Sequence, residues 1–477
     1  MKKHIASLAI AAVATNIAYA EVKLPSIIGS NMVLQQQSEA RLWGIAKGTV
    51  KITTSWSSNT ISAQTDNNGH WQAQIPTPTA SFEPQTITLT DADKKSITLS
   101  NVLIGEVWLA SGQSNMEMPL KGFPGCCIEG GIDEIFNAST EKGIRFFTVP
   151  LKQSYQEETD VDAQWTIPSA QTAPDYSATA WYYAKSVSHA LDVPIGIVSC
   201  AYGGTKVESW MSKELLESYG LSTQKEDIEN TQWPFYRRMV TYNAMFCPIH
   251  QYTYKGIIWY QGESNVGEHA TYAQRLADMV SLWRKQIGLG NIPFYYVEIA
   301  PYCYEDDGQA GKAAWLREAQ FNAQKLIPNS GIVSTCDLVL PQEYHNIHPR
   351  NKKTVGQRLA SLALNQTYNQ IQFVPGGPTY KELIVEGNEA FVGFDNLPMG
   401  ICSNYMIEGF EVAGADKIFY PADKVWLRWQ TNHIVVSSEK VSQPVAVRFC
   451  FRDFAHGTLY GGSFMPAFPF RTDNWDE

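Results

Sequence analysis

The chain has 477 residues, of which 44% are hydrophobic and 18% are charged, and its formal net charge is −10. These values predict a globular protein of about three domains with a large core, and they exclude a disordered chain. The acidic balance and the lack of a basic stripe argue against binding to nucleic acid. An anionic ligand would need a local cation, because the protein as a whole repels it.

The first twenty residues have the three parts of a secretory signal peptide. Lys2 and Lys3 precede a largely apolar run over residues 5–14, and Ala18 and Ala20 stand at the expected cleavage point. No later stretch approaches the roughly 20 apolar residues that span a bilayer. We therefore expect a signal peptide at residues 1–20 and an exported protein, periplasmic or extracellular, without a membrane span.

The next region, residues 21–100, has the pattern of an antiparallel β domain. Short runs rich in Val, Ile and Thr are interrupted by Asn67-Asn68-Gly69 and by prolines. Trp71-Gln72-Ala73-Gln74-Ile75 alternates as a half-buried strand does.

Residues 101–367 alternate apolar strands with helical patterns, which indicates a parallel sheet with helices on both faces. Helices are expected over residues 178–191, 272–287 and 352–364. After residue 367 the helical pattern disappears, and residues 368–477 read as a second β domain. The predicted fold class is therefore α/β, with a β domain on either side of the central one.

One motif of the central region suggests nucleophilic catalysis. The apolar run 107–110 leads into a turn that presents Ser114 between Gln113 and Asn115. A serine hydroxyl needs a base and fixed N–H donors to become an effective nucleophile. Turns after two other strands, at Gly203-Gly204 and at Gln261, together with a loop containing His348, offer such groups. Turns at the same edge of an open parallel sheet share one crevice, so these groups can meet.

The four motifs resemble the conserved blocks of the SGNH hydrolases, and their amino-acid sequences resemble those of the sialate O-acetylesterase family of that superfamily. The segments are GQSNM (112–116), YGGTKVESW (202–210), WYQGESN (259–265) and IHP (347–349). Further likeness lies at residues 237–248, 315–320, 447–449 and 469–473, so the resemblance covers nearly the whole mature chain. It implies an SGNH-hydrolase-like fold and a serine carboxylic-ester hydrolase.

The resemblance also implies roles for single residues. Ser114 would be the nucleophile, and His348 the general base and later the general acid. The backbone N–H groups of Ser114 and of the Gly203-Gly204 turn would bind the oxyanion. Where the superfamily has an asparagine donor, this chain offers Gln261 or, as the second choice, Asn265.

The chain departs from the superfamily at the acid of the triad. His345 stands three residues before His348, where an aspartate is usual. Either Glu343 or Asp337 reaches the ring from elsewhere, or a backbone carbonyl orients the ring and the enzyme works as a Ser–His dyad. The residues alone leave these alternatives open.

The substrate that the resemblance implies is acetylated sialic acid, whose carboxylate needs a cation. Arg317 is the first candidate for this role and Lys206 the second. Gln113, Asn115 and Glu263 are further candidates for substrate contact, with Glu263 as a hydrogen-bond acceptor. Trp108, Trp259 and the turn at Tyr202 are expected as walls of the acetyl pocket.

Two other functions fit the residues. An acetylxylan esterase or another glycan O-acetylesterase would use the same machinery. A non-catalytic glycan-binding protein would use the 14 tryptophans and 23 tyrosines as stacking platforms. Neither the cysteines nor the histidines have the spacing of a zinc site, so no metal and no cofactor are expected.

Overall fold

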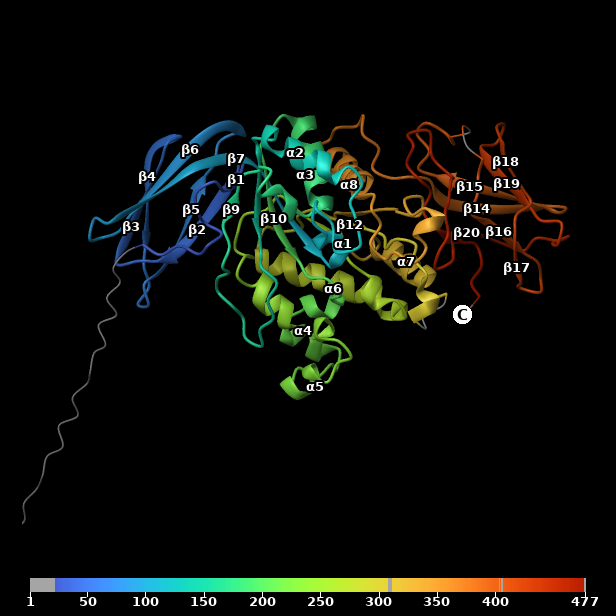
Figure 1. Cartoon of the computed structure of the whole chain (residues 1–477), viewed down its shortest axis with the longest axis horizontal. Helices are drawn as coiled ribbons and strands as arrows, with labels where there is room; N and C mark the ends of the chain where they lie inside the picture. The colour runs from blue at the N-terminus through green and yellow to red at the C-terminus, as the bar shows by residue number, and fades with distance from the viewer. Residues whose placement is uncertain (1–21, 308–310, 403, 405, 476–477) are drawn as a thin grey trace, which may run out of the picture.

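The computed structural model describes residues 22–307, 311–402, 404 and 406–475, so the predicted signal peptide lies outside the described residues. Three parts follow one another along the long axis of the molecule (Figure 1). A central sheet with helices lies between N-terminal strands at one end and C-terminal strands at the other. This arrangement confirms the predicted α/β class with flanking β domains.

The central sheet is parallel except at one edge. Its strands follow the order β13-β12-β11-β7-β10-β8-β9, and in this series β9 alone is antiparallel to its neighbour. The strands are β7 (Ser96–Gly112), β8 (Ile144–Thr148), β9 (Trp165–Thr166), β10 (Ile195–Ala201), β11 (Gly256–Tyr260), β12 (Phe294–Val297) and β13 (Ser330–Val333). Every residue of β10, β11 and β12 is buried, because helices cover both faces of the sheet.

Alternate side chains of each central strand meet different helices. Trp108 of β7 belongs to one apolar core with α3 and α8, whereas its neighbour Leu109 belongs to another core with α6 and α7. In β11, Ile258 belongs to the core with α3 and α8, and Trp259 belongs to the core with α6 and α7. The long helices are α3 (Ala178–Leu191), α6 (His269–Ile287), α7 (Lys312–Ala323) and α8 (Lys352–Gln366). They include all three helices that the sequence predicts.

Strand β7 is shared between the central sheet and the N-terminal strands. Its first half pairs with β6 and its middle with β1, before its last residues pair with β10 and β11. The N-terminal strands are β1 (Val33–Gln35), β2 (Glu39–Ile45), β3 (Thr49–Thr54), β4 (Ser57–Gln64), β5 (His70–Pro76) and β6 (Ser81–Thr90). Because β7 is continuous through residues 100 and 101, the predicted boundary there falls inside a strand. The domain boundaries stay predictions.

The C-terminal part consists of two antiparallel four-stranded sheets around an apolar core. One has the order β14-β15-β19-β18 and the other β17-β16-β20-β21. Val392, Val412 and Val447 bring strands of both sheets into one core. The strands are β14 (Thr379–Glu386), β15 (Glu389–Asp395), β16 (Phe410–Ala413), β17 (Phe419–Pro421), β18 (Lys424–Arg428), β19 (His433–Ser437), β20 (Ala446–Phe449) and β21 (Phe470–Arg471).

The connections of the central part carry short helices. These are α1 (Ser114–Glu117), α2 (Gly131–Asn137), α4 (Lys213–Ser218) and α5 (Lys225–Glu229). Within the described ranges, no helix combines the length and apolar character needed to cross a membrane.

Candidate active site

The turns after three neighbouring strands lie side by side at one edge of the central sheet. Gly112 at the end of β7 is in register with Ala201 of β10 and with Tyr260 of β11. Gly112 permits this close approach, because its φ is 138° and a Cβ there would lie 2.1 Å from the Tyr260 carbonyl oxygen. Ser114 begins α1 two residues later.

Ser114 and His348 are in hydrogen-bond contact, although 234 positions separate them in the chain. The Ser114 Oγ lies 2.9 Å from the His348 Nε2. The Asn346 side chain accepts a hydrogen bond from the His348 backbone N–H at 3.0 Å, and the imidazole packs edge-on against Phe123. This geometry allows the imidazole to take the hydroxyl proton. The catalytic roles assigned to the two residues stay predictions.

The surroundings of His348 keep its ring neutral. Burial, and to a smaller extent the charge of Lys352, lower the pKa of His348 to about 4. At neutral pH the imidazole therefore has an unprotonated nitrogen that can accept a proton from Ser114.

The two carboxylates expected beside His348 have other partners, which corrects the prediction. Glu343 pairs with Arg350 at 3.2 Å. Asp337 forms a two-point ion pair with Arg358, at 2.6 and 2.7 Å. Within the described part of the chain, neither carboxylate forms a hydrogen bond to the ring of His348. Of the alternatives that the sequence left open, the geometry favours the Ser–His dyad.

The backbone N–H of Gly203, expected in the oxyanion hole, donates to the carboxylate of Glu117. Burial raises the pKa of Glu117, and the hydrogen bond from Gly203 opposes this shift. An oxyanion bound at Gly203 must therefore displace a carboxylate of α1. The N–H groups of Ser114 and Gly204 are the other two predicted backbone donors. Gly204 has to be a glycine, because its φ is 76° and a Cβ there would lie 2.5 Å from the Phe235 ring.

The side-chain amides expected as a third oxyanion donor are held elsewhere, which is a second correction. The Gln261 Nε2 donates to the Asn265 side chain at 2.8 Å. The Asn265 Nδ2 in turn donates to Glu208 at 3.1 Å and to Glu268 at 2.7 Å. Both amides are buried and stabilise the turn after β11 instead of facing a substrate.

A buried lysine that the sequence analysis missed joins the segments around Ser114 and His348. The Lys352 Nζ donates to the Asn115 side chain at 2.6 Å and to the Pro349 carbonyl at 2.8 Å. The Asn115 amide donates to the Glu263 carboxylate and, at 3.1 Å, to the Ile347 carbonyl. The network Lys352–Asn115–Glu263 thus fixes the residue after Ser114 and both neighbours of His348.

Burial dominates the electrostatics of this network. It lowers the pKa of Lys352 to about 7, although Glu263 opposes the shift, and it raises the pKa of Glu263. A sequence signal for Lys352 did exist, since it precedes Val355 and Leu359 at the helical spacing of a buried face. A charged residue on such a face needs a partner.

A cavity of about 760 Å³ borders Ser114 and His348. Its aromatic walls are Trp233, Phe235, Tyr236 and Tyr304. The expected walls Trp108 and Trp259 are fully buried in the two cores and do not line it. The only sequence signal for residues 233–236 was a cluster of aromatic residues around a proline in a loop.

Lys206 and not Arg317 brings a positive charge to this cavity, which is a third correction. Arg317 is buried, and its guanidinium donates to the backbone carbonyls of Arg452 and Asp453. Lys206 lines the cavity and pairs with Glu268 at 2.6 Å. Of the described residues that line the cavity, Lys206 is the only lysine or arginine.

The polar residues predicted at the substrate differ in position. Gln113 and Glu263 line the cavity, whereas Asn115 is buried in the network with Lys352. The Gln113 Oε1 accepts the Gly262 N–H at 3.1 Å and so orders the turn after β11. The Glu263 Oε2 is buried and has no hydrogen-bond partner among the described residues.

The strand order, the turn that carries Ser114 and its contact with His348 together define a serine hydrolase of the SGNH type. The sequence model of the family described as carbohydrate esterase, sialic acid-specific acetylesterase, matches residues 104–365. The chain belongs to this family of serine esterases.

Curated relatives and a solved structure agree with this assignment. The sialate O-acetylesterase of Mus musculus is 28% identical over 426 residues, which are 76% of this chain and 76% of the relative. That of Homo sapiens is 28% identical over 391 residues, 75% and 73% of the two chains. The crystal structure of a carbohydrate acetylesterase from Xanthomonas citri is similar over 95% of this chain and 100% of its own, with a TM-score of 0.83 and 28% identity.

We predict that Lys352→Met moves the acid limb of catalysis to higher pH. Lys352 is charged below pH 7 and disfavours the protonated form of His348. Its removal therefore raises the pKa of His348 above about 4, while burial still holds that pKa below its usual value. The measurement is the pH dependence of kcat/KM for p-nitrophenyl acetate, with the folded state checked by circular dichroism. Lys353→Met, an exposed neighbour, serves as the control, and an unmoved acid limb in Lys352→Met would contradict the electrostatic account.

We also predict that Glu117→Gln raises kcat/KM for p-nitrophenyl acetate by about fivefold. A charged acceptor holds an N–H more strongly than a neutral amide does, by about 1 kcal/mol, so glutamine yields Gly203 to the oxyanion more readily. The control is Glu129→Gln on the surface. A loss of activity in Glu117→Gln would show that the carboxylate assists the reaction and does not compete with it.

Proposed function

We propose that the protein is an exported esterase that removes O-acetyl groups from sialic acid through an acetyl-serine intermediate. The observation that carries the proposal is the 2.9 Å contact between the Ser114 hydroxyl and the His348 ring at a cavity. The family assignment and the relatives named sialate O-acetylesterase support the substrate.

The reaction uses two half-steps. In the first, His348 takes the hydroxyl proton while the Ser114 oxygen attacks the acetyl carbonyl carbon. The bond from that carbon to the sugar oxygen breaks, and the sugar oxygen receives the proton from His348. In the second, His348 takes a proton from water, whose oxygen attacks the acetyl-serine, and acetate leaves as Ser114 regains its proton.

Backbone N–H donors stabilise the negative charge on the oxygen of each tetrahedral intermediate. The Ser114 N–H at the start of α1 and the N–H groups of Gly203 and Gly204 are the donors that the turn geometry offers. Release of Gly203 from Glu117 accompanies binding of the oxyanion. Burial raises the pKa of Glu117, and its protonated form would compete less for this donor.

Two side chains of the cavity suit a sialic acid. Glu263 lines the cavity, and a rotation that brings its buried Oε2 to the cavity surface would let this oxygen, which has no partner among the described residues, accept a hydrogen bond from a sugar hydroxyl. Lys206 can pair with the sugar carboxylate if it exchanges Glu268 for the ligand. Trp233 and Tyr236 offer apolar surfaces for the ring.

A second candidate substrate is an acetylated glycan without sialic acid, such as acetylxylan. The similar structure from Xanthomonas citri is described as a carbohydrate acetylesterase, without mention of sialate. Such a substrate would use Ser114 and His348 in the same way and would make no use of Lys206.

The deciding experiment measures acetate release from 9-O-acetylated sialic acid and from acetylated xylan. We expect the exported protein, with Glu21 as its first residue, to prefer the sialic acid. Ser114→Ala should lose at least about 10³-fold in kcat, since this serine forms the intermediate. Ser218→Ala, which changes an exposed serine of α4, should retain activity. Preference for acetylated xylan would overturn sialic acid as the substrate. Esterase activity found only in the cytoplasmic fraction of the cells would overturn export.

A further inference from the structure

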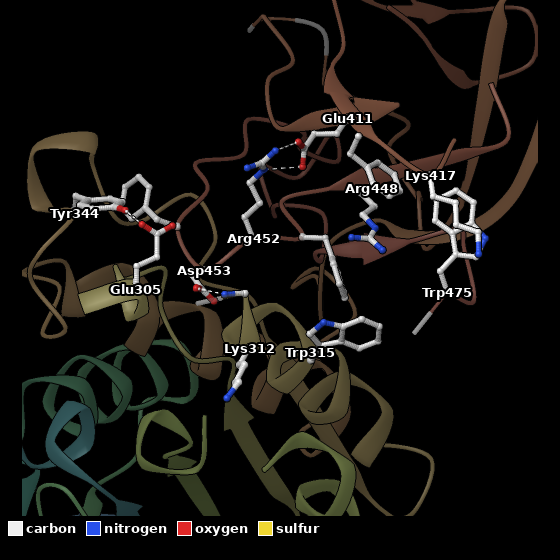
Figure 2. A pocket seen from close by; sticks show the side chains of 14 residues that line it. Glu305, Lys312, Trp315, Tyr344, Glu411, Lys417, Arg448, Arg452, Asp453 and Trp475 are labelled. Atoms are coloured by element: carbon white, nitrogen blue, oxygen red, sulfur yellow. Dashed lines mark hydrogen bonds and ion pairs between the residues drawn. The ribbon is translucent and has the colours of Figure 1, made fainter. Parts of the chain in front are cut away.

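A second cavity, of about 720 Å³, lies between the hydrolase part and the C-terminal sheets (Figure 2). On the hydrolase side it is lined by Glu305, Lys312 and Trp315, and on the other side by residues of the C-terminal part. We propose that this cavity binds saccharide residues of the glycan that carries the acetyl ester. The inference rests on the proposed function for the identity of that glycan.

Aromatic side chains form much of the cavity wall, as sugar-binding sites require for stacking on C–H faces. They are Trp315, Tyr344, Phe419, Phe451, Phe454 and Trp475. Trp315 and Phe451 meet edge to face with ring centres 5.4 Å apart, and the Arg471 guanidinium lies over the Trp315 ring at 4.3 Å, so the plane of Trp315 is fixed and part of its surface is covered. Trp475 comes from the far side of the cavity, beside Lys417 (Figure 2).

The polar groups of the cavity are held in fixed orientations. Asp473 accepts hydrogen bonds from the Arg448 Nε and Nη2, both at 2.9 Å, so that among the described residues the Arg448 Nη1 stays open to a ligand. The Arg448 guanidinium points into the space above Trp315 in Figure 2. Arg452 forms an ion pair with Glu411 on the same side. Rigid planar donors beside aromatic rings give directional hydrogen bonds to sugar hydroxyls at low entropic cost.

The charges of this cavity nearly balance, which suits a hydroxyl-rich ligand better than a strongly anionic one. The cations of the lining are Lys312, Lys417, Arg448 and Arg452, and the carboxylates are Glu305, Glu411 and Asp453. The two arginines are compensated by Asp473 and Glu411. Asp453 accepts hydrogen bonds from two backbone N–H groups at the start of α7, which fixes its carboxylate. A phosphate or a polyanion would meet these carboxylates as well as the cations.

The position of the cavity connects it with the esterase site. Tyr304 lines the cavity at Ser114, and the next residue, Glu305, lines the second cavity. Likewise Ile347 lines the first cavity and Tyr344 the second. Tyr344 donates a hydrogen bond to Glu305 at 3.4 Å, so the two segments form one wall. A glycan held on one side of this wall can present its acetylated end on the other.

The test is calorimetric titration of the whole protein with 3′-sialyllactose, which carries no ester. Trp475→Ala should weaken binding by about tenfold, which corresponds to the loss of one stacking contact of about 1.4 kcal/mol. Trp429→Ala is the matched control, since Trp429 is an exposed tryptophan of the same C-terminal part outside the cavity. Lys417→Ala, at an exposed position of the cavity, is a second variant and should also weaken binding.

Hydrolysis of p-nitrophenyl acetate by the same variants separates this inference from the esterase proposal. Trp475→Ala should leave that activity unchanged, because the small ester does not reach the second cavity. Equal affinity of Trp475→Ala and Trp429→Ala for the trisaccharide, or no binding by the wild type, would overturn the saccharide site. Binding that depends on Trp475 in a protein without sialate esterase activity would instead overturn the proposed function alone.

Discussion

Parallel pairing of β7 with β10 and β11 is the constraint on which the site depends. It aligns the ends of three strands, so that turns separated by up to about 150 residues share one edge. The alignment requires Gly112, since a side chain there would collide with the Tyr260 backbone. The long strand β7 also ties this edge to the N-terminal sheet, and helices on both faces bury the strands that carry the turns.

The charged groups around Ser114 are arranged differently from those of a serine–histidine–aspartate triad. No described carboxylate orients the ring of His348. A buried network of Lys352, Asn115 and Glu263 instead fixes the backbone on either side of the two catalytic candidates. Burial and, to a smaller extent, the lysine lower the pKa of His348, whereas an aspartate would raise it. The imidazole is therefore a weaker base that stays neutral over a wider range of pH.

The sequence predicted the fold class and the meeting of Ser114 with His348, because strand periodicity and local turn motifs report directly on sheet edges. It could not assign the partners of long side chains. Asp337, Gln261 and Arg317 each bind groups that only tertiary packing brings near, which are the Arg358 guanidinium, the Thr205 carbonyl and the Arg452 carbonyl. Nothing in a local pattern distinguishes such a structural pair from a substrate contact. The aromatic wall at residues 233–236 was missed because it belongs to a loop, whose residues show no periodicity that would predict their position.

The central claim is that the Ser114 oxygen carries the acyl group during turnover. Mixing the protein with p-nitrophenyl acetate, quenching in acid within the first turnover and mapping acetylated peptides by mass spectrometry tests it directly. The account predicts one added acetyl group on Ser114, formed as fast as p-nitrophenol is released and lost as acetate appears. Acetylation confined to another residue, such as Ser264 or Lys206, while hydrolysis proceeds at its normal rate would contradict the account.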